Sequence, residues 1–278
     1  MAIIINNYPV NADEATFNTN PLSQIKYNGV VVWESASFTD PFWIQTLSND
    51  RCMIYSGSGG IRYYYSRDKV NWYTYTSNNW LDTYAGEKIY FRYSSNFTTG
   101  FKPKVEGTAL WNVGGHLSSI YPTSNFGSWW ASDFFVFQNI VNAGELILPT
   151  TFTGDHNFFE MFLGCAELTT PPALPAINLA PYCYYSMFEG CTKLNTIPAL
   201  PATTLPERCY GLMFKNCASL YFSETYADPY LNAFRIPDTG TGTVGTNSLT
   251  NIFTGTGGTF TGPAQINTTY YTSNSIKR

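Results

Sequence analysis

The sequence predicts a mostly β chain whose C-terminal half is a solenoid of short repeats. One observation is a repeat carried by Met161–Cys165, Met187–Cys191 and Met213–Cys217, which share the pattern Met-Phe-x-x-Cys at a constant step in the numbering (187 − 161 = 26 and 213 − 187 = 26). A fixed period of this length indicates one supersecondary unit stacked on copies of itself. The other is a composition rich in aromatic residues and poor in charge, which is typical of β structure.

Composition limits the classes of function. Charged residues make up 12% of the 278 residues, against roughly a quarter in an ordinary soluble domain, and aromatic residues make up 17%. The net charge of −4 argues against a nucleic-acid partner. Because no apolar run approaches the roughly 18 residues of a membrane span, we expect no membrane insertion. Met1–Asn7 lacks the basic and apolar segments of a secretory signal, so we expect synthesis and folding in a cytoplasm.

The six cysteines follow the repeat. Cys165, Cys191 and Cys217 share one repeat position, and Cys183 and Cys209 share another, whereas Cys52 stands alone in an expected strand. Equivalent positions of a solenoid form stacks, and cysteine is a small residue suited to a buried stack. Neighbouring rungs are close enough for a disulfide, but we favour buried free thiols. No cysteine spacing fits a zinc site, and we expect neither a metal nor a cofactor.

Residues 1–35 read as a small β unit that docks on a partner. Asn28-Gly29 stands between two strand-like runs, Ile25–Tyr27 and Val30–Trp33, which is a strong hairpin signal. A further short strand is expected within Ile3–Val10. A unit this small cannot bury a core alone, so it must pack against something else. The candidate docking residues are Tyr27, Val31 and Trp33.

Residues 36–120 read as a β-sandwich module. Short aromatic strands are expected at Ile61–Tyr65, Asn71–Thr76 and Lys88–Tyr93. Turn clusters at 66–70 and 85–87 separate them. Short strands divided by regular turn signals favour two packed sheets.

Residues 121–278 hold the solenoid with atypical terminal repeats. In each full repeat, an extended piece such as Leu194–Pro198 predicts a strand, and a piece such as Pro206–Phe214 predicts one or two helical turns with proline first. Phe134–Phe137 is the expected degenerate first repeat, since Phe162 follows Phe137 at nearly the repeat step (162 − 137 = 25). Ile252-Phe253 is the expected last one, after an insertion near 238–246 that reads as a surface loop.

These residues resemble a known family. The Met-Phe-x-Gly-Cys-x-x-Leu core and Leu200–Leu205 look like BspA-type leucine-rich repeats, which occur on bacterial surfaces and in gut-phage proteins. The module before them, with Tyr65–Asp68 and Ala85–Arg92, is similar to one that often accompanies such repeats. The head, Ile25–Trp33, looks like the start of many phage tail proteins. The chain departs from longer family members in having few repeats.

The resemblance implies a non-enzymatic structural protein of a phage tail or fibre, from a phage of Bacteroides-like, crAss-like type. Its localisation would be the virion, assembled in the host cytoplasm. Its partners would be other virion proteins through the N-terminal unit and a glycan or protein of the host surface, and it would form a homo-oligomer. One alternative is a bacterial surface adhesin of the same repeat type. Another is a carbohydrate-active enzyme, which needs two carboxylates converging in a cleft.

Enzyme motifs are scarce. His116 and His156 are the two histidines, which leaves little scope for histidine acid–base chemistry. Asp155, His156 and Glu160 lie close enough in sequence to meet a metal ion, but a loop leading into a helix explains them as well. No pair of carboxylates stands out. We therefore expect no catalytic residues.

Aromatic residues are the candidate ligand-binding material, because flat rings on a β surface can stack on sugars. The candidates are Tyr63, Tyr65, Trp72, Tyr73, Trp129 and Trp130. The alternative for each is ordinary packing on a sheet face or in the core. Neighbours in an extended segment point to opposite faces, so at least one of Trp129 and Trp130 should lie outside the local core.

Overall fold

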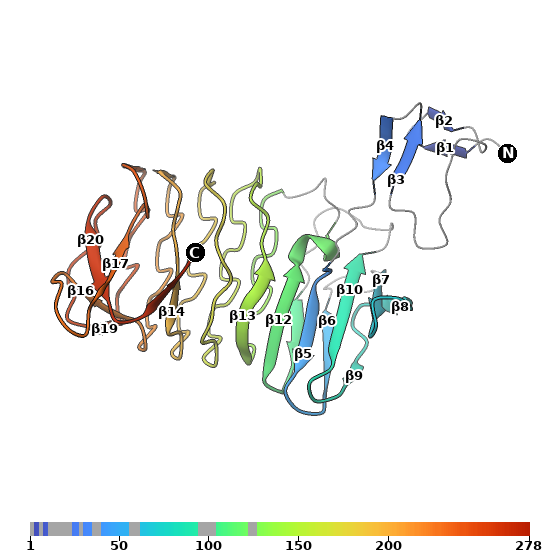
Figure 1. Ribbon diagram of the computed structural model, residues 1–278, viewed down its shortest axis with the longest axis horizontal. Coiled ribbons are helices and arrows are strands. Elements are labelled where there is room, and N and C mark those ends of the chain that lie inside the picture. Colours follow the sequence, from blue (N-terminus) through green and yellow to red (C-terminus); the bar gives the residue numbers. More distant parts are fainter. Residues whose placement is uncertain are drawn as a thin grey trace. The chain divides into compact units, whose positions relative to one another are not determined.

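The structure is a computed structural model, and the residues that it describes are 3–5, 8–10, 24–27, 30–34, 40–55, 62–93, 104–121 and 127–278. The chain divides into two compact units, Met1–Asp40 and Pro41–Arg278. Across the described residues the chain is mostly β, with several sheets and no α-helix, which confirms the predicted class at this level (Figure 1).

The first unit contains two antiparallel strand pairs. Strands β1 (Ile3–Ile5) and β2 (Tyr8–Val10) form one pair. Strands β3 (Gln24–Tyr27) and β4 (Val30–Glu34) form the other, with Tyr27 opposite Val30. The hairpin predicted around Asn28-Gly29 is thus confirmed. The candidate docking residues Tyr27, Val31 and Trp33 lie in this hairpin, but their side chains are outside the part that the structure describes.

The second unit begins with two sheets. The larger has the strand order β13-β12-β5-β10-β7-β8, and the smaller has the order β11-β6-β9. Their bounds are β5 Trp43–Thr46, β6 Asp50–Tyr55, β7 Arg62–Ser66, β8 Tyr73–Thr76, β9 Leu81–Thr83, β10 Lys88–Tyr93, β11 Lys104–Gly107, β12 Trp111–His116 and β13 Ile140–Ile147. Strands β7, β8 and β10 confirm the three predicted aromatic strands.

The two sheets share one buried core. Ile54 and Val105 of the smaller sheet and Phe91 and Trp111 of the larger are all at most 1% exposed. They belong to one cluster of buried residues. A Cβ atom added at Gly107 would lie 1.9 Å from Trp111 Cζ2, so the small sheet can approach this indole only through a glycine.

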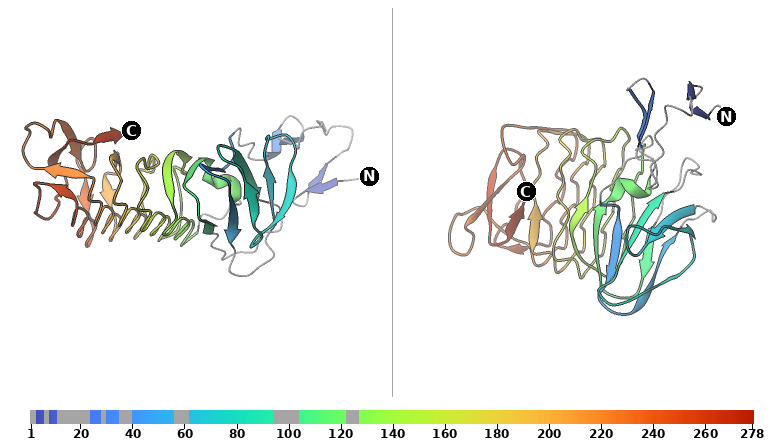
Figure 2. Two further views of the ribbon diagram at one scale, coloured as in Figure 1. Left: turned by 90° about the horizontal axis from the view of Figure 1, so that it is seen from below. Right: turned by 45° about the vertical axis from the view of Figure 1, so that its right-hand side comes forward.

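From β13 onward the chain stacks coil upon coil (Figures 1 and 2). The sheet continues into the stack without a break at residue 120, since β13 pairs in parallel with β12 and accepts a hydrogen bond from Thr169 N at Val141 O. Asn195 N donates to Thr169 O, one coil further on. The buried core also runs through both parts. Strand β14 (Thr196–Pro198), paired with β21 (Ser275–Lys277), confirms the predicted extended piece.

The predicted helical turns are wrong. The segments 182–190 and 208–216 are ribbons of turns with a left-handed residue at every fourth position: Tyr182, Ser186 and Gly190 have φ of 58°, 51° and 77°. Alternate N–H groups of a ribbon donate to the next coil, as from Phe188 N to Met213 O at 3.0 Å. An α-helix would direct every N–H along its own axis and leave neighbouring coils unpaired. Hydrogen bonding between coils therefore replaces the helix.

Side chains stack in the same register as the backbone. The rings of Phe162, Phe188, Phe214 and Phe253 form a continuous buried column. Phe253 thus fills the repeat position predicted for it across the insertion. At the other end, Phe135 stacks on Phe162 at 5.0 Å between ring centroids. Phe135, not Phe137, thus joins the column, because Phe137 is 71% exposed.

Cysteines form a second buried column. The thiols of Cys165, Cys191 and Cys217 each donate to a carbonyl oxygen one coil back, at 2.9, 3.1 and 3.0 Å. The five cysteines of the repeat are free and buried, as predicted from their spacing, and Cys52 is also free and buried. Burial raises the pKa of the Cys165 thiol to about 12 and also raises the pKa of the Cys191 thiol. The column therefore consists of neutral thiols that act as hydrogen-bond donors.

A small sheet packs against the end of the phenylalanine column at the far end of the stack. Its order is β17-β20-β16-β19, with bounds β16 Tyr221–Ser223, β17 Asn232–Arg235, β19 Gly257–Gly258 and β20 Thr269–Thr272 (Figure 1). The insertion at 238–246 is mostly exposed, as predicted for a loop, although it contains β18 (Thr243–Val244), which pairs with β15 (Thr204–Leu205). Phe234 and Phe260 pack against Phe253 and close the phenylalanine column.

Candidate functional site

One side of the stack carries a ladder of rings from successive coils. The Trp129 and His156 rings are nearly parallel, with centroids 3.9 Å apart. His156 stacks in turn on Tyr182, at 4.5 Å and 6° between ring planes. The guanidinium of Arg208 lies 5.7 Å from the centroid of the Tyr182 ring. These four residues define the aromatic ladder.

A second, shorter row flanks the ladder. Phe159 stacks on Tyr185 with centroids 5.4 Å apart. The two rows touch where the Trp129 ring meets the Phe159 ring edge-on at 5.5 Å. In the next coil the position of Tyr185 is held by Gly211, where an added Cβ atom would lie 2.9 Å from the Tyr185 ring. The ladder and this row together form the aromatic face: Trp129, His156, Phe159, Tyr182, Tyr185 and Arg208.

The repeat itself places these side chains. His156, Tyr182 and Arg208 occupy the same position of successive repeats, and each begins the turn ribbon of its coil. All three have left-handed backbones, with φ of 54°, 58° and 50°. Such a conformation costs a non-glycine residue about 1–2 kcal/mol, and here the hydrogen bonds between coils hold it. The N–H group of His156 donates to Pro181 O at 3.0 Å.

Charged groups border the aromatic face. His156 Nδ1 lies 3.4 Å from Asp155 Oδ1, and hydrogen bonds from Ser128 and then from His156 lower the pKa of the Asp155 carboxyl. The pKa of Glu160 is raised, by partial burial and then by the neighbouring carboxylate of Asp133. Next to these groups, a salt bridge of 2.8 Å joins Glu189 to Lys215 of the next coil. The border is therefore mixed in sign.

The predicted pair Trp129 and Trp130 divides between surface and core. Trp129 is 38% exposed and begins the ladder. Trp130 is 5% exposed and packs against Tyr121 and Phe158. The prediction that one of the two lies outside the core is confirmed. Trp130 serves packing, whereas ligand binding by Trp129 stays a prediction.

The four candidates in the sheets do not join this face. Tyr63 is fully buried, so its ring is part of the core and is not open to a ligand. Tyr65 is half-buried beside Tyr73, which is 55% exposed. Trp72 is half-buried, with the Arg92 guanidinium 4.1 Å from its ring centroid. The structure therefore separates the six predicted residues into three groups. Tyr63 and Trp130 are buried in the core, Trp129 belongs to the aromatic face, and the others lie in the sheet region: Tyr65, Trp72 and Tyr73.

Sequence reasoning missed most of the aromatic face. Tyr182, Tyr185 and Arg208 carried a usable signal, because they stand one repeat after His156, Phe159 and Tyr182. His156 was considered with Asp155 and Glu160 as a metal ligand. Within the described part of the chain, no three His, Cys, Asp or Glu side chains converge as a metal site requires. His156 instead stacks between two rings.

Cavities lie elsewhere. One of about 810 Å³ is at the far end of the stack and is lined by residues between Val244 and Ile266. A smaller one, of about 140 Å³, includes Arg235, Asp238 and Arg278. Neither contains a pair of carboxylates. The adjacent carboxylates of Asp133 and Glu160 lie outside both cavities.

Comparisons of the chain with protein-family models, with curated proteins and with solved structures gave no match. None of the helices in the described residues has the length and apolar character needed to cross a membrane.

Proposed function

We propose that the chain is a non-enzymatic structural protein of a phage tail or fibre whose aromatic face binds a protein of the host surface. The observation that carries the binding role is the aromatic ladder, in which Trp129, Tyr182 and Arg208 lie in one row. Tryptophan, tyrosine and arginine are the residues that most often dominate binding energy at protein interfaces. The phage assignment rests on the resemblance of the repeat, the sheet module and the head.

The geometry of the ladder favours a protein over a glycan. Sugar recognition by aromatic residues uses ring faces, but the near-parallel stacking of Trp129, His156 and Tyr182 covers both faces of His156 and one face of each of the other two rings. What the ladder offers outward is ring edges together with a guanidinium. Ring edges and charged rims suit the irregular surface of a folded protein.

We further propose that the stacked coils are a leucine-rich-repeat solenoid of the BspA type and that the two large sheets form a β-sandwich. Support for the solenoid comes from Leu168, Leu194 and Leu220, which recur once per repeat and are all fully buried. The contact of Gly107 with Trp111 between the sheets supports the sandwich. The N-terminal hairpin, through Tyr27, Val31 and Trp33, would dock the chain on another virion protein.

The location of the protein tests the assignment. Mass spectrometry of gradient-purified phage particles, beside the host envelope fraction, should find this chain at a fixed and symmetric copy number in the particles. A symmetric number would also support the proposed homo-oligomer. Enrichment in the envelope with none in particles would favour the alternative of a bacterial surface adhesin.

A substitution tests the aromatic face. We expect Trp129→Ala to weaken binding of the purified chain to intact host cells about tenfold, because it removes the largest ring of the ladder. Tyr226→Ala is the matched control, since Tyr226 is 63% exposed and lies outside the face. Protease treatment of the cells should abolish binding. Loss on periodate oxidation of glycans, with protease-treated cells still bound, would assign a glycan and contradict the protein ligand.

The enzyme alternative rests on Asp133 and Glu160. A carboxyl with a raised pKa beside a second carboxylate is the arrangement that acid–base catalysis uses. Its position on the outside of the coils, away from both described cavities, argues for a structural contact instead. Glycan cleavage by the wild-type chain that is lost in Glu160→Gln would establish the enzyme.

A further inference from the structure

The turn ribbons have a direction. In the ribbon 208–216, alternate N–H groups donate to carbonyl oxygens of the next coil at 2.8–3.1 Å. The donors are Arg208, Tyr210, Leu212, Phe214 and Asn216, and the acceptors are Thr246, Ser248, Thr250, Ile252 and Thr254. The ribbon 182–190 donates in the same direction. Both ribbons therefore present a complete row of donors toward the C-terminal end of the stack.

The terminal ribbon, residues 247–255, repeats this geometry with no coil beyond it. Asn247, Asn251 and Gly255 have φ of 56°, 53° and 76°, like the left-handed positions of the preceding ribbon. The five equivalent donors are the N–H groups of Asn247, Leu249, Asn251, Phe253 and Gly255. In the described structure none of these five groups has an acceptor. The stack thus ends on an unpaired row of backbone donors.

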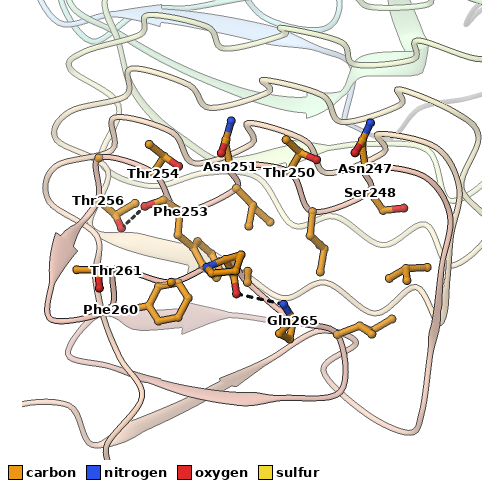
Figure 3. A pocket seen from close by; sticks show the side chains of 18 of the residues that line it. Asn247, Ser248, Thr250, Asn251, Phe253, Thr254, Thr256, Phe260, Thr261 and Gln265 are labelled. Atoms are coloured by element: carbon orange, nitrogen blue, oxygen red, sulfur yellow. Dashed lines mark hydrogen bonds between the residues drawn. The ribbon is translucent and has the colours of Figure 1, made fainter.

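A cavity lies along this row. Its volume is about 810 Å³. The terminal ribbon forms one wall, and the segment Gly258–Ile266 with Val244, Gly245 and Thr256 completes the lining. Figure 3 shows Asn247, Thr250, Asn251 and Thr254 in a line on one side, with Phe260 and Gln265 across from them. The lining contains no ionisable side chain. The cavity therefore offers no counter-charge, and its N–H row requires an occupant that supplies hydrogen-bond acceptors.

The stack itself shows which acceptor fits such a row. In the ribbons 182–190 and 208–216, all five donors are paired with carbonyl oxygens at alternate residues of the following peptide segment. A single bound anion would engage two or three adjacent N–H groups and leave the others unpaired. Open backbone edges are sites where a further peptide segment adds by main-chain hydrogen bonds.

We propose that the terminal ribbon is a docking edge for an uncharged peptide segment of a partner protein. This segment pairs with the ribbon in the way that a following coil pairs with the ribbon before it. The main-chain carbonyls of that segment accept from the N–H row, and its side chains enter the cavity. This site shares no residue with the aromatic face or with the N-terminal hairpin. It gives the chain an additional protein contact, independent of host binding.

Amide hydrogen exchange of the full chain, read by NMR, tests the edge. In the free protein the five terminal N–H groups should exchange quickly, while those of Arg208, Leu212 and Phe214 are protected. The probe is a capped synthetic peptide with the sequence of Thr246–Thr256, the segment whose carbonyls already pair with a ribbon donor row. At about 1 mM it should protect the terminal N–H groups, and its mirror-image D-peptide should not.

A variant that fills the cavity completes the test. An added Cβ atom at Gly262 meets nothing closer than 3.6 Å, so Gly262→Trp is tolerated locally and places an indole in the cavity. It should weaken peptide protection at least about tenfold. Gly127→Trp is the control, because nothing lies within 4 Å of its added Cβ atom.

Several results would overturn the proposal. These are terminal N–H groups already protected in the free chain, equal protection by the L- and D-peptides, or no protection by the L-peptide. Equal protection by inorganic sulfate would assign an anion site instead. Protection that grows with the concentration of the chain alone would assign the edge to a second copy.

Discussion

Tyr184 and Tyr210 carry hydroxyls into the interior of the stack. Both residues are fully buried, and neither hydroxyl has a hydrogen-bond partner among the described residues. Burying a hydroxyl without a hydrogen-bond partner destabilises the folded state, because the group loses its hydrogen bonds to water and gains none in return. The ring is what the stack needs from these positions, because Tyr184 stacks on Phe158 and on Tyr210.

Removing such a hydroxyl should therefore stabilise the protein. We expect Tyr184→Phe to raise the free energy of unfolding by about 1 kcal/mol, since it keeps the ring and relieves the buried polar group. Tyr182→Phe is the control, because its half-buried hydroxyl contacts Glu207 Oε1 at 3.3 Å. Urea denaturation of the two variants measures both values. A loss of stability in Tyr184→Phe would mean that this hydroxyl is paired in solution.

The buried thiols make the free energy of unfolding fall at alkaline pH. The pKa of Cys165 is raised from 9.0 to about 12 by burial. Between these two values the folded chain keeps a proton that the unfolded chain has lost, so stability is complete below about pH 9 and falls as pH rises toward 12. Each such thiol contributes a fall of about 1.4 kcal/mol per pH unit. We expect the free energy of unfolding of Cys165→Ala to fall less steeply with pH than that of the wild type, by this amount, in unfolding curves measured at increasing pH.

The turn ribbon is the element in which sequence and structure differ most. Proline at the start of a segment and apolar residues at close spacing are helix signals, and Pro206–Phe214 has both. Hydrogen bonding between coils overrides this local helix propensity, because it pairs the backbone groups of several segments at once. A signal was present: glycine or asparagine at 164, 190, 216 and 255 tolerates the left-handed backbone required there.

Substitutions at this position should have opposite effects. Gly190 has φ of 77°, and an added Cβ atom would meet nothing closer than 3.6 Å, so the cost of Gly190→Ala is in the backbone. We expect it to lower the free energy of unfolding by about 1–2 kcal/mol. Asn216→Gly, at the equivalent position with φ of 61°, relieves the left-handed strain but gives the unfolded chain more freedom, so stability should be unchanged or rise by up to about 1 kcal/mol. Equal effects in the two variants would contradict a common left-handed position.

What sequence could predict follows from which interactions are local. The period, the aromatic strands and the Asn-Gly hairpin depend on neighbouring residues, and the structure contains all three. Exposure of a given ring depends on segments far away in the chain. Tyr63 looks like a surface residue in its strand, yet it is buried by Tyr75 and the second sheet's core. The sequence predicted that at least one of Trp129 and Trp130 lies outside the core, but it did not predict which one.

At the scale of the whole molecule, residues 41–278 share one continuous core that runs from the sheets to the end of the stack. Long repeat arrays can unfold coil by coil. Here the stack is short, and a sheet packs against its buried core at each end, so we expect one cooperative transition for this unit. Cys52 in the sheets and Cys217 in the stack should become reactive toward a thiol reagent at the same denaturant concentration. Earlier reaction of Cys217 would show that the coils unfold first.

The column of phenylalanine rings has a consequence for how such a chain can change length. The ring centroids of Phe162, Phe188 and Phe214 are spaced at 5.6 and 5.8 Å. The coil that contains Phe214 accepts hydrogen bonds from the preceding coil through its carbonyl oxygens and donates to the following coil through its N–H groups. Duplicating one repeat unit in the gene would therefore move the two ends apart by a fixed increment and leave both unchanged. The stack can serve as an adjustable spacer, in which the number of coils sets the reach of whatever the two ends hold.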